Sequence, residues 1–168
     1  MGVIPATTRT SSWCLVFNVL FPRAPHLMKG YYENDEANKE SFDGDWFRTG
    51  DVVTYDEEGF FYIVDRNKDM IKVKGYQVSP TELENEIRSA AGAGVSDVAV
   101  IGVPDERAGE VPRAFIVRTS EDITAEKIEA LLEPNIAKYK RLKGGIVFLE
   151  QLPKSPTGKV LRKELRKY

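Results

Sequence analysis

The sequence predicts an α+β fold in which a small mixed sheet is flanked by helices. Short alternating or continuous apolar runs, typical of strands, are interspersed with two segments of helical periodicity, and no internal repeat or low-complexity tract interrupts them. The 168 residues are 42% hydrophobic and 30% charged, which is ordinary for a globular protein. A net charge of −2 provides no excess of positive charge for binding nucleic acid, so no nucleic-acid partner is expected.

The histidine and cysteine content excludes several kinds of site. Cys14 is the only cysteine and His26 the only histidine, so an internal disulfide, a cysteine zinc site and a histidine metal cluster are all excluded. No G-x-S-x-G nucleophile motif accompanies His26, which we expect to be structural or exposed. No metal site is therefore predicted.

The amino-terminal apolar run, residues 13–21, is too short to span a bilayer as a helix. It is interrupted by Asn18, and no small-residue cleavage site follows it. A core strand, a weak signal-peptide core and an unrelated leader remain as alternatives. No transmembrane segment is predicted.

Residues 33–64 predict a short polar segment followed by a hairpin. The acidic segment 33–40 is expected to form a short exposed helix or a loop. Strands are expected over residues 52–55 and 60–64. Between them lies Asp56-Glu57-Glu58-Gly59, a four-residue loop with glycine at a position where a positive φ is favourable.

Residues 62–77 form the central stretch, in which a strand is followed by a charged turn and a second strand that ends at Gly75. Ile71 and Val73 alternate with Lys72 and Lys74. This pattern predicts a half-buried strand with two ammonium groups on its solvent-exposed face. Since lysines on an edge strand discourage association between sheets, a protected edge is the simplest explanation of this stretch taken alone.

A helix is expected to begin directly after the central stretch. Ser79 is a suitable N-cap, Pro80 fits the first helical position, and Glu82 completes a capping box. The buried face is predicted to contain Leu83, Ile87, Ala90 and Ala91, and Gly92 or Gly94 ends the helix.

The remaining elements alternate between strands and helices. Residues 98–103 predict a central strand buried on both faces, followed by a polar loop at 105–110 and a strand at 114–117. A second amphipathic helix begins near Thr124 and is kinked or ended by Pro134. The last elements are a strand at 146–149, a loop at 152–159 and a short basic helix at 161–167.

The pair Gly158-Lys159 is not the end of a phosphate-binding P-loop. The required first glycine would stand at Pro153, and Val160 replaces the Ser/Thr that holds magnesium. What remains is a lysine on a loop restricted by two prolines and a glycine. An ammonium group held in this way is suited to carboxylate or phosphate oxygens, although Lys159 taken alone is better explained as a solvated surface lysine.

Two residues at strand ends are candidates for binding a nucleotide. Asp51 follows Thr49-Gly50 at a turn, and carboxylates accept hydrogen bonds from ribose hydroxyls. Arg66 follows a strand and provides a rigid fork of donors. Ordinary turn chemistry is the alternative for both residues.

Taken together, the motifs resemble the carboxyl-terminal part of the adenylate-forming superfamily, which includes acyl-CoA synthetases, 4-coumarate–CoA ligases and firefly luciferases. The resemblance covers residues 23–168. It rests on four motifs in order, supported by Gly109-Glu110-Val111-Pro112 and Lys140-Arg141-Leu142: Trp46-Phe47-Arg48-Thr49-Gly50-Asp51, Val64-Asp65-Arg66, Ile71-Lys72-Val73-Lys74-Gly75-Tyr76-Gln77-Val78-Ser79-Pro80 and Pro156-Thr157-Gly158-Lys159-Val160-Leu161-Arg162.

The resemblance implies roles for the first half-reaction, in which a carboxylic acid and ATP, with Mg²⁺, form an acyl-adenylate. Asp51 would bind the ribose hydroxyls, with Arg66 assisting. Lys159 would act as a catalytic residue that contacts the carboxylate and α-phosphate oxygens. Negative charge accumulates on these oxygens in the transition state, which fits a lysine at this place.

For the second half-reaction, the resemblance implies a rotation of the small domain about a hinge at Lys68. After it, catalytic Lys72 and nucleotide-binding Gln77, together with Lys74 and Gly75, would form the face at which CoA attacks to give the thioester. One small domain would thus present two lysine-bearing surfaces in turn.

The resemblance also implies a domain division. Residues 1–22 would be an unmatched leader, 23–64 the β-rich end of the large AMP-binding domain, and 65–168 the carboxyl-terminal lid domain. The large amino-terminal domain, with its phosphate loop, adenine-binding motif and acyl pocket, is missing as a partner. A truncated product, an alternative first exon or an imperfect gene model would account for this.

The expected function is therefore the carboxyl-terminal part of an ATP-dependent acid–thiol ligase, inactive by itself. A non-catalytic binding or regulatory module and a fragment of a luciferase-like monooxygenase are the alternatives. The acid remains open because its pocket would lie in the large domain. The cellular compartment also remains open between cytoplasm and peroxisome, since the chain ends Arg166-Lys167-Tyr168 and not Ser-Lys-Leu.

Overall fold

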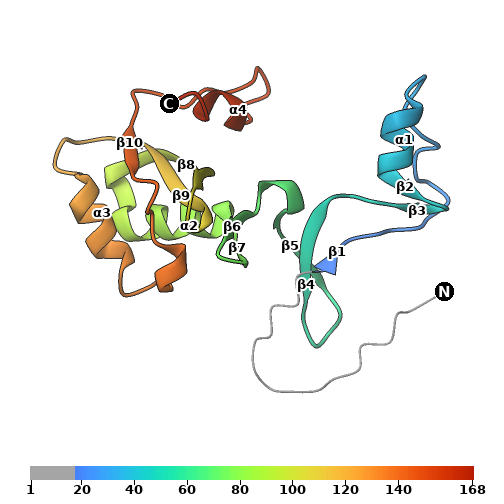
Figure 1. Cartoon of the computed structure of the whole chain (residues 1–168), viewed down its shortest axis with the longest axis horizontal. Helices are drawn as coiled ribbons and strands as arrows, with labels where there is room; N and C mark the ends of the chain where they lie inside the picture. Colours follow the sequence, from blue (N-terminus) through green and yellow to red (C-terminus); the bar gives the residue numbers. More distant parts are fainter. Residues whose placement is uncertain (1–17) are drawn as a thin grey trace.

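The computed structural model describes residues 18–168 and consists of two lobes joined by a short segment between β5 and β6 (Figure 1). Most of the apolar run at 13–21 lies outside the described residues, and its last part contributes β1. The first lobe contains β1 (Asn18–Val19), α1 (Asp35–Ser41), β2 (Phe42–Asp43), β3 (Trp46–Phe47), β4 (Asp51–Tyr55) and β5 (Phe61–Arg66).

The second lobe holds most of the hydrophobic core. Its elements are η1 (Asn67–Asp69), β6 (Ile71–Val73), β7 (Tyr76–Val78), α2 (Pro80–Ala91), η2 (Gly92–Gly94), β8 (Val95–Asp105), β9 (Gly109–Arg118), α3 (Ala125–Leu132), η3 (Lys138–Lys140), β10 (Ile146–Phe148) and α4 (Arg162–Leu165). The mixture of helices with open, mostly antiparallel sheets confirms the predicted α+β class.

The first lobe is built on the predicted hairpin. Strands β4 and β5 pair antiparallel, and β1 adds to β4 to give the order β1-β4-β5. The Asp56 carboxylate closes the hairpin loop, because it accepts hydrogen bonds from the amides of Glu58 and Phe60. The polar segment before the hairpin is helix α1, capped by the Asn34 side chain. Asp35–Ser41 buries no residue, as its charged sequence predicted.

The hairpin of β6 and β7 confirms the strand predicted in the central stretch, but Lys74 lies outside that strand. Ile71 and Val73 are buried and Lys72 between them is exposed. Lys74 lies in the turn, not on the strand, with φ of 50°. With Gly75 at 85°, both turn residues have positive φ, as in a type I′ turn. The prediction of two lysines side by side on one strand face was therefore wrong.

Helix α2 begins where the sequence predicted. The hydroxyl oxygen of Ser79 accepts a hydrogen bond from the amide of Glu82, and Pro80 occupies the first turn. The carboxylate of Glu82 does not return to the cap but binds the ammonium of Lys140 at 2.5 Å. Leu83 and Ile87 are completely buried, and the helix ends at Gly92 with φ of 54°.

Strands β8 and β9 form a long antiparallel hairpin that exceeds the predicted lengths at both ends. Half of the expected loop at 105–110 is strand, since Asp105 pairs with Gly109 and the turn is limited to residues 106–108. The Asp105 carboxylate closes the turn by accepting the amides of Arg107 and Ala108. Strand β8 pairs only with β9 within residues 18–168, so it is an edge strand buried on both faces and not the predicted central one.

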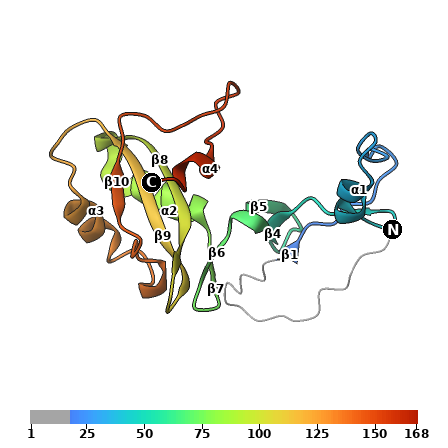
Figure 2. The ribbon, with the colours of Figure 1, turned by 45° about the horizontal axis from the view of Figure 1, so that its top comes forward.

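The last elements complete the sheet and cover it. Helix α3, capped by Thr124, ends before Pro134 as expected, and β10 returns parallel to β9. Side chains on one face of the β8–β9 ribbon pack with those of α2 and α3, while those on the other face, including Phe115, pack with Leu152 and Leu165. The turned view shows α4 and α3 on separate sides of the ribbon (Figure 2).

Candidate functional site

The candidate ribose site lies where the first lobe meets the connection between the lobes. Asp51 and Arg66 are opposite each other at the end of the β4–β5 ladder, and they form an ion pair in which Arg66 Nε lies 2.8 Å from Asp51 Oδ1. The Asp51 side chain is 17% exposed and that of Arg66 53%. The structure thus brings together two residues that are fifteen positions apart in the sequence. Arg66 stays accessible while it fixes the orientation of the carboxylate.

The junction between the lobes runs through the predicted hinge. Lys68 is an exposed residue of η1. On one side of it, the amide of Asn67 donates to the carbonyl of Gly50 in the first lobe. Buried Asp65 is bound to the second lobe instead, because its carboxylate accepts hydrogen bonds from the Ser79 hydroxyl at 2.7 Å and the Thr81 amide at 3.0 Å. Strand β5 therefore ends in contacts with both lobes.

The predicted thioester residues gather on the β6–β7 hairpin. Lys72 and Gln77 are paired across the two strands, and Lys74 and Gly75 form the turn between them. The backbone of Lys72 is fixed by the Glu110 carboxylate, which accepts its amide at 2.9 Å. This contact gives Glu110 of the Gly109-Glu110-Val111-Pro112 motif a structural role, which the sequence alone did not indicate.

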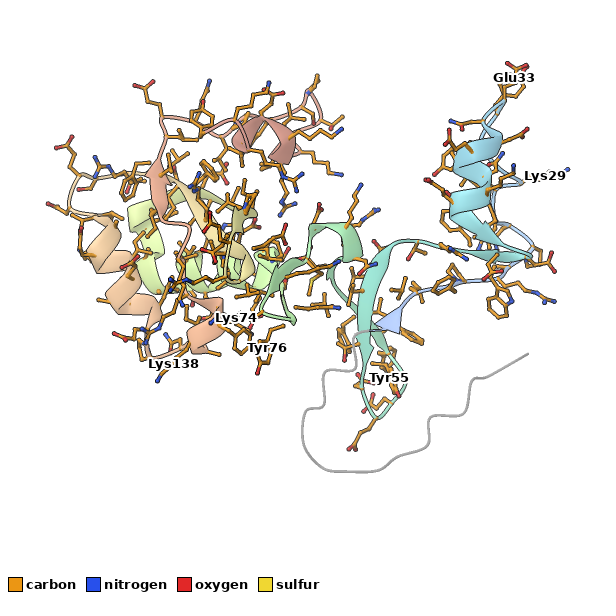
Figure 3. The ribbon with its side chains drawn as sticks, viewed as in Figure 1. Lys29, Glu33, Tyr55, Lys74, Tyr76 and Lys138 are labelled. Atoms are coloured by element: carbon orange, nitrogen blue, oxygen red, sulfur yellow. The ribbon has the colours of Figure 1, made fainter. Side chains whose placement is uncertain are left out.

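An aromatic pair beside this hairpin was missed. The rings of Tyr76 and Tyr139 stack with centroids 4.4 Å apart and planes 14° apart. Figure 3 shows Lys74, Tyr76 and Lys138 at the same end of the second lobe. Tyr139 lies 63 positions after Tyr76, so only the folded chain reveals the pair.

Lys159 lies on a second tight turn. The amide of Ser155 donates to the Lys159 carbonyl at 2.8 Å, and the Lys159 amide donates to the Ser155 hydroxyl at 3.2 Å. Gly158 provides the positive φ of 82° that the turn requires. Within residues 18–168, the ammonium groups of Lys159 and Lys72 form no ion pair with a carboxylate. The restricted loop predicted from the prolines and the glycine is confirmed.

The two lysine-bearing loops lie at opposite ends of the second lobe. In both ribbon views, the loop that precedes α4 and the β6–β7 hairpin point away from each other (Figures 1 and 2). The structure therefore assembles Asp51 with Arg66, and Lys72 with Lys74, Gly75 and Gln77, but it does not bring Lys159 to either group.

Buried acids are the other feature that sequence reasoning missed. Glu84 faces inward from α2, and burial raises the pKa of its carboxyl above the ordinary value. The hydrogen bond from the Val100 amide and the charge of Arg162 offset only part of this rise. Nothing in the sequence indicates that this glutamate, which stands between two apolar positions of an expected helix, is buried. Its partners come from β8 and α4, which are distant in sequence.

One groove in the second lobe lies apart from the predicted site residues. A groove of about 480 Å³ runs between α3 and the segment after it, away from every predicted site residue. In the part of the chain that the structure describes, no three metal-ligating side chains gather. No helix among those residues is long and apolar enough to cross a membrane.

The chain is similar to CoA ligases along most of its length. A 4-coumarate–CoA ligase-like protein of Oryza sativa is 47% identical over 138 residues, which are 81% of this chain and 25% of that protein. The chain spans about a quarter of the length of the curated relatives it matches.

Two solved structures have the same fold over nearly the whole chain. MatB from Rhodopseudomonas palustris with bound ATP superposes with a TM-score of 0.81 and 35% identity, covering 90% of this chain and 30% of that one. The o-succinylbenzoate CoA synthetase MenE of Bacillus subtilis, in complex with its acyl-adenylate intermediate, gives 0.79 and 32%, covering 88% and 30%.

The family assignment rests on a match to residues 74–159, which begins in the β6–β7 turn and ends at the candidate catalytic lysine. The match includes the long β8–β9 hairpin and α3, and thus most of the second lobe. The chain belongs to the AMP-binding enzyme C-terminal domain family of adenylate-forming enzymes, and it corresponds to the carboxyl-terminal portion of its relatives.

Proposed function

We propose that the chain is the carboxyl-terminal part of an ATP-dependent acid–thiol ligase that makes acyl-CoA through an acyl-adenylate. The observation that carries this proposal is the display of Lys159 on a hydrogen-bonded turn of a domain from this family, with no ion pair within residues 18–168. A lysine held in this way is available for the oxygens of a substrate.

In the first half-reaction, Asp51 accepts hydrogen bonds from the ribose hydroxyls of ATP, and Arg66 holds that carboxylate in place. The 2.8 Å contact between them supports this division of roles, because it leaves one carboxylate oxygen of Asp51 for the ribose. Lys159 then stabilises the charge that develops when the substrate carboxylate attacks the α-phosphorus and pyrophosphate leaves.

In the second half-reaction, the β6–β7 hairpin replaces Lys159 at the reacting centre. The separation of the two loops within one lobe supports a rotation, since both cannot face the same nucleotide at once. Lys68 in the exposed junction is the proposed hinge residue. The thiolate of CoA then attacks the acyl carbonyl, a thioester bond forms and AMP leaves.

The stacked tyrosines support a nucleotide-containing thiol as the second substrate. The ring pair of Tyr76 and Tyr139 lies next to Lys74 and Lys138 (Figure 3). Aromatic faces bind bases by stacking, and ammonium groups bind phosphates. This surface borders the residues proposed for the thioester step.

The first lobe supports the proposal that the working enzyme contains a larger domain. Four consecutive side chains of the β4–β5 hairpin are apolar or aromatic and more than half exposed, from Phe60 to Ile63. Exposed strips of this kind mark a surface that packs against another part of a protein. We therefore propose that residues 23–64 are the β-rich end of a large AMP-binding domain, and that the 168 residues alone are catalytically inactive.

Pyrophosphate exchange tests the proposal. The purified chain, mixed with ATP, Mg²⁺ and a panel of fatty and aromatic acids, is expected to show no exchange. Addition of a separately expressed large domain from a 4-coumarate–CoA ligase is expected to restore exchange, and Lys159→Ala is expected to abolish it. Exchange by the chain alone would refute its inactivity. A complex that forms without exchange would favour the non-catalytic binding module.

A further inference from the structure

Arg162 connects the loop of Lys159 to the rest of the second lobe. It is the first residue of α4 and follows Lys159 by three positions. Its NH2 donates to Glu84 Oε1 at 3.0 Å, and its NH1 lies 3.7 Å from Asp69 Oδ2. Only 27% of the side chain is exposed, so the guanidinium group binds both carboxylates in a largely enclosed place.

Glu84 is a fixed partner for this arginine. Its side chain is 11% exposed, and the same Oε1 atom accepts the amide of Val100 at 2.9 Å. That amide lies on the edge of β8 that pairs with no strand among the described residues. One carboxylate therefore joins α2, the free edge of β8 and α4.

Asp69 connects the arginine to the junction between the lobes. It is the last residue of η1 and directly follows Lys68. Because Arg162 reaches both Asp69 and Glu84, the segment that changes direction between the lobes is linked by one side chain to the loop of Lys159. No other ion pair of the described residues joins η1 to the carboxyl-terminal segment.

The stem of the loop has a separate attachment. The ammonium of Lys154 lies 2.6 Å from Asp97 on β8, and Lys154 and Val160 form an isolated bridge across the stem. The stem is thus held to β8 at one side, while Arg162 holds the other side to α2 and η1. Removal of Arg162 takes away both ion pairs on the second side and leaves only the apolar contacts of Val160 and Leu165 there.

We propose that Arg162 is a positioning residue that holds the loop of Lys159 against the junction segment, through Glu84 and Asp69. This inference rests on the proposed function, in which Lys159 and Lys68 are the catalytic and hinge residues. Its consequence is that the loop keeps its orientation relative to the junction when the lobes turn. Lysine at this position keeps the charge but loses the fork that reaches two carboxylates.

Hydrogen exchange of the purified chain tests the proposal without any ligand. Exchange of the amides in residues 154–161 is measured by mass spectrometry for the wild type and for Arg162→Gln, Arg162→Lys and Arg166→Gln. The loss of a charge-assisted contact is expected to raise loop exchange on the order of tenfold in Arg162→Gln and less in Arg162→Lys. Arg166 is an exposed arginine of the same segment without an ion pair among the described residues, so Arg166→Gln serves as the matched control.

A pH profile separates this linkage from a general loss of packing. Glu84 is faced by Arg162 from α4, by Arg88 of its own helix and by the Val100 amide from β8, and Asp69 lies across Arg162. When the loop opens, Arg162 moves away while Glu84 stays packed between α2 and β8, so protonation of Glu84, which removes the charge pair, favours the open loop; in global unfolding the carboxyl instead returns to water. After correction for intrinsic exchange, loop exchange in the wild type is therefore expected to rise as the pH falls, and Glu84→Gln is expected to remove this dependence.

The outcomes are decisive in both directions. Equal loop exchange in Arg162→Gln and Arg166→Gln would overturn the proposal, and so would an unchanged pH profile in Glu84→Gln. Circular dichroism excludes unfolding, and Arg162→Lys provides a second reading if Arg162→Gln does not fold. The hydrogen-exchange experiment uses no substrate. If it gives the expected result while pyrophosphate exchange is not restored by the large domain, the proposed function is refuted and the positioning role of Arg162 is not.

Discussion

Replacing Gly75 by alanine is expected to destabilise the β6–β7 hairpin by about 1–2 kcal/mol, the cost of a Cβ in the left-handed region. Gly75 has φ of 85°, and a Cβ built at this position meets no other atom within 4 Å. The cost is therefore conformational and not a clash. Since this turn positions Lys72 opposite Gln77, its stability matters for the proposed thioester face.

The neighbouring residue, Lys74, provides a control for which no comparable loss of stability is expected. Lys74 already carries the cost of a positive φ, 50°, with a side chain. Lys74→Gly relieves this strain but makes the unfolded chain more flexible, which costs about 0.4–1 kcal/mol, so little net change is expected. Asparagine tolerates this backbone region, so Lys74→Asn is expected to be neutral or stabilising and Gly75→Asn less harmful than Gly75→Ala.

Thermal unfolding followed by circular dichroism measures these effects. For a chain of this size, about 1–2 kcal/mol corresponds to a fall in Tm of roughly 2–8 °C for Gly75→Ala. The reasoning would be refuted if Gly75→Ala melted with the wild type, or if Lys74→Gly were destabilised as strongly as Gly75→Ala. Either result would mean that the two residues do not form the turn described above.

Three further predictions concern the second lobe. Leu83 is completely buried, so Leu83→Ala is expected to cost about 2–5 kcal/mol in urea unfolding, whereas a change within 1 kcal/mol would contradict its place in the core. Ser79→Ala removes the helix cap and a partner of Asp65, and about 1–2 kcal/mol is expected to be lost; Ser79→Thr should retain most of it. Burial raises the pKa of Glu84, so its contribution to stability is fully present below the pKa of about 4.5 that the unfolded chain has and is lost as the pH rises through the folded pKa. Urea titrations from pH 4 to 8 should therefore show a flatter profile for Glu84→Gln than for the wild type, and equal slopes would contradict this.

The local elements were predictable because their causes are local. The cap at Ser79, the helix end before Pro134 and the hairpin loop closed by Asp56 each depend on residues within a few positions. Order and spacing of motifs then indicated the family, because backbone turns at Gly75 and Gly158 require particular residues at fixed places.

The tertiary structure decided everything that depends on distant partners. Whether β8 is central or at an edge follows from which strands pair, and apolar residues on both faces are equally compatible with either position. The same holds for Asp51 with Arg66, Tyr76 with Tyr139, and Glu84 with Arg162, whose contacts form only when separate elements pack. The sequence alone thus determined the family and the residue types available for chemistry. Only the fold decided which of them meet, because side-chain contacts depend on spatial and not sequential distance.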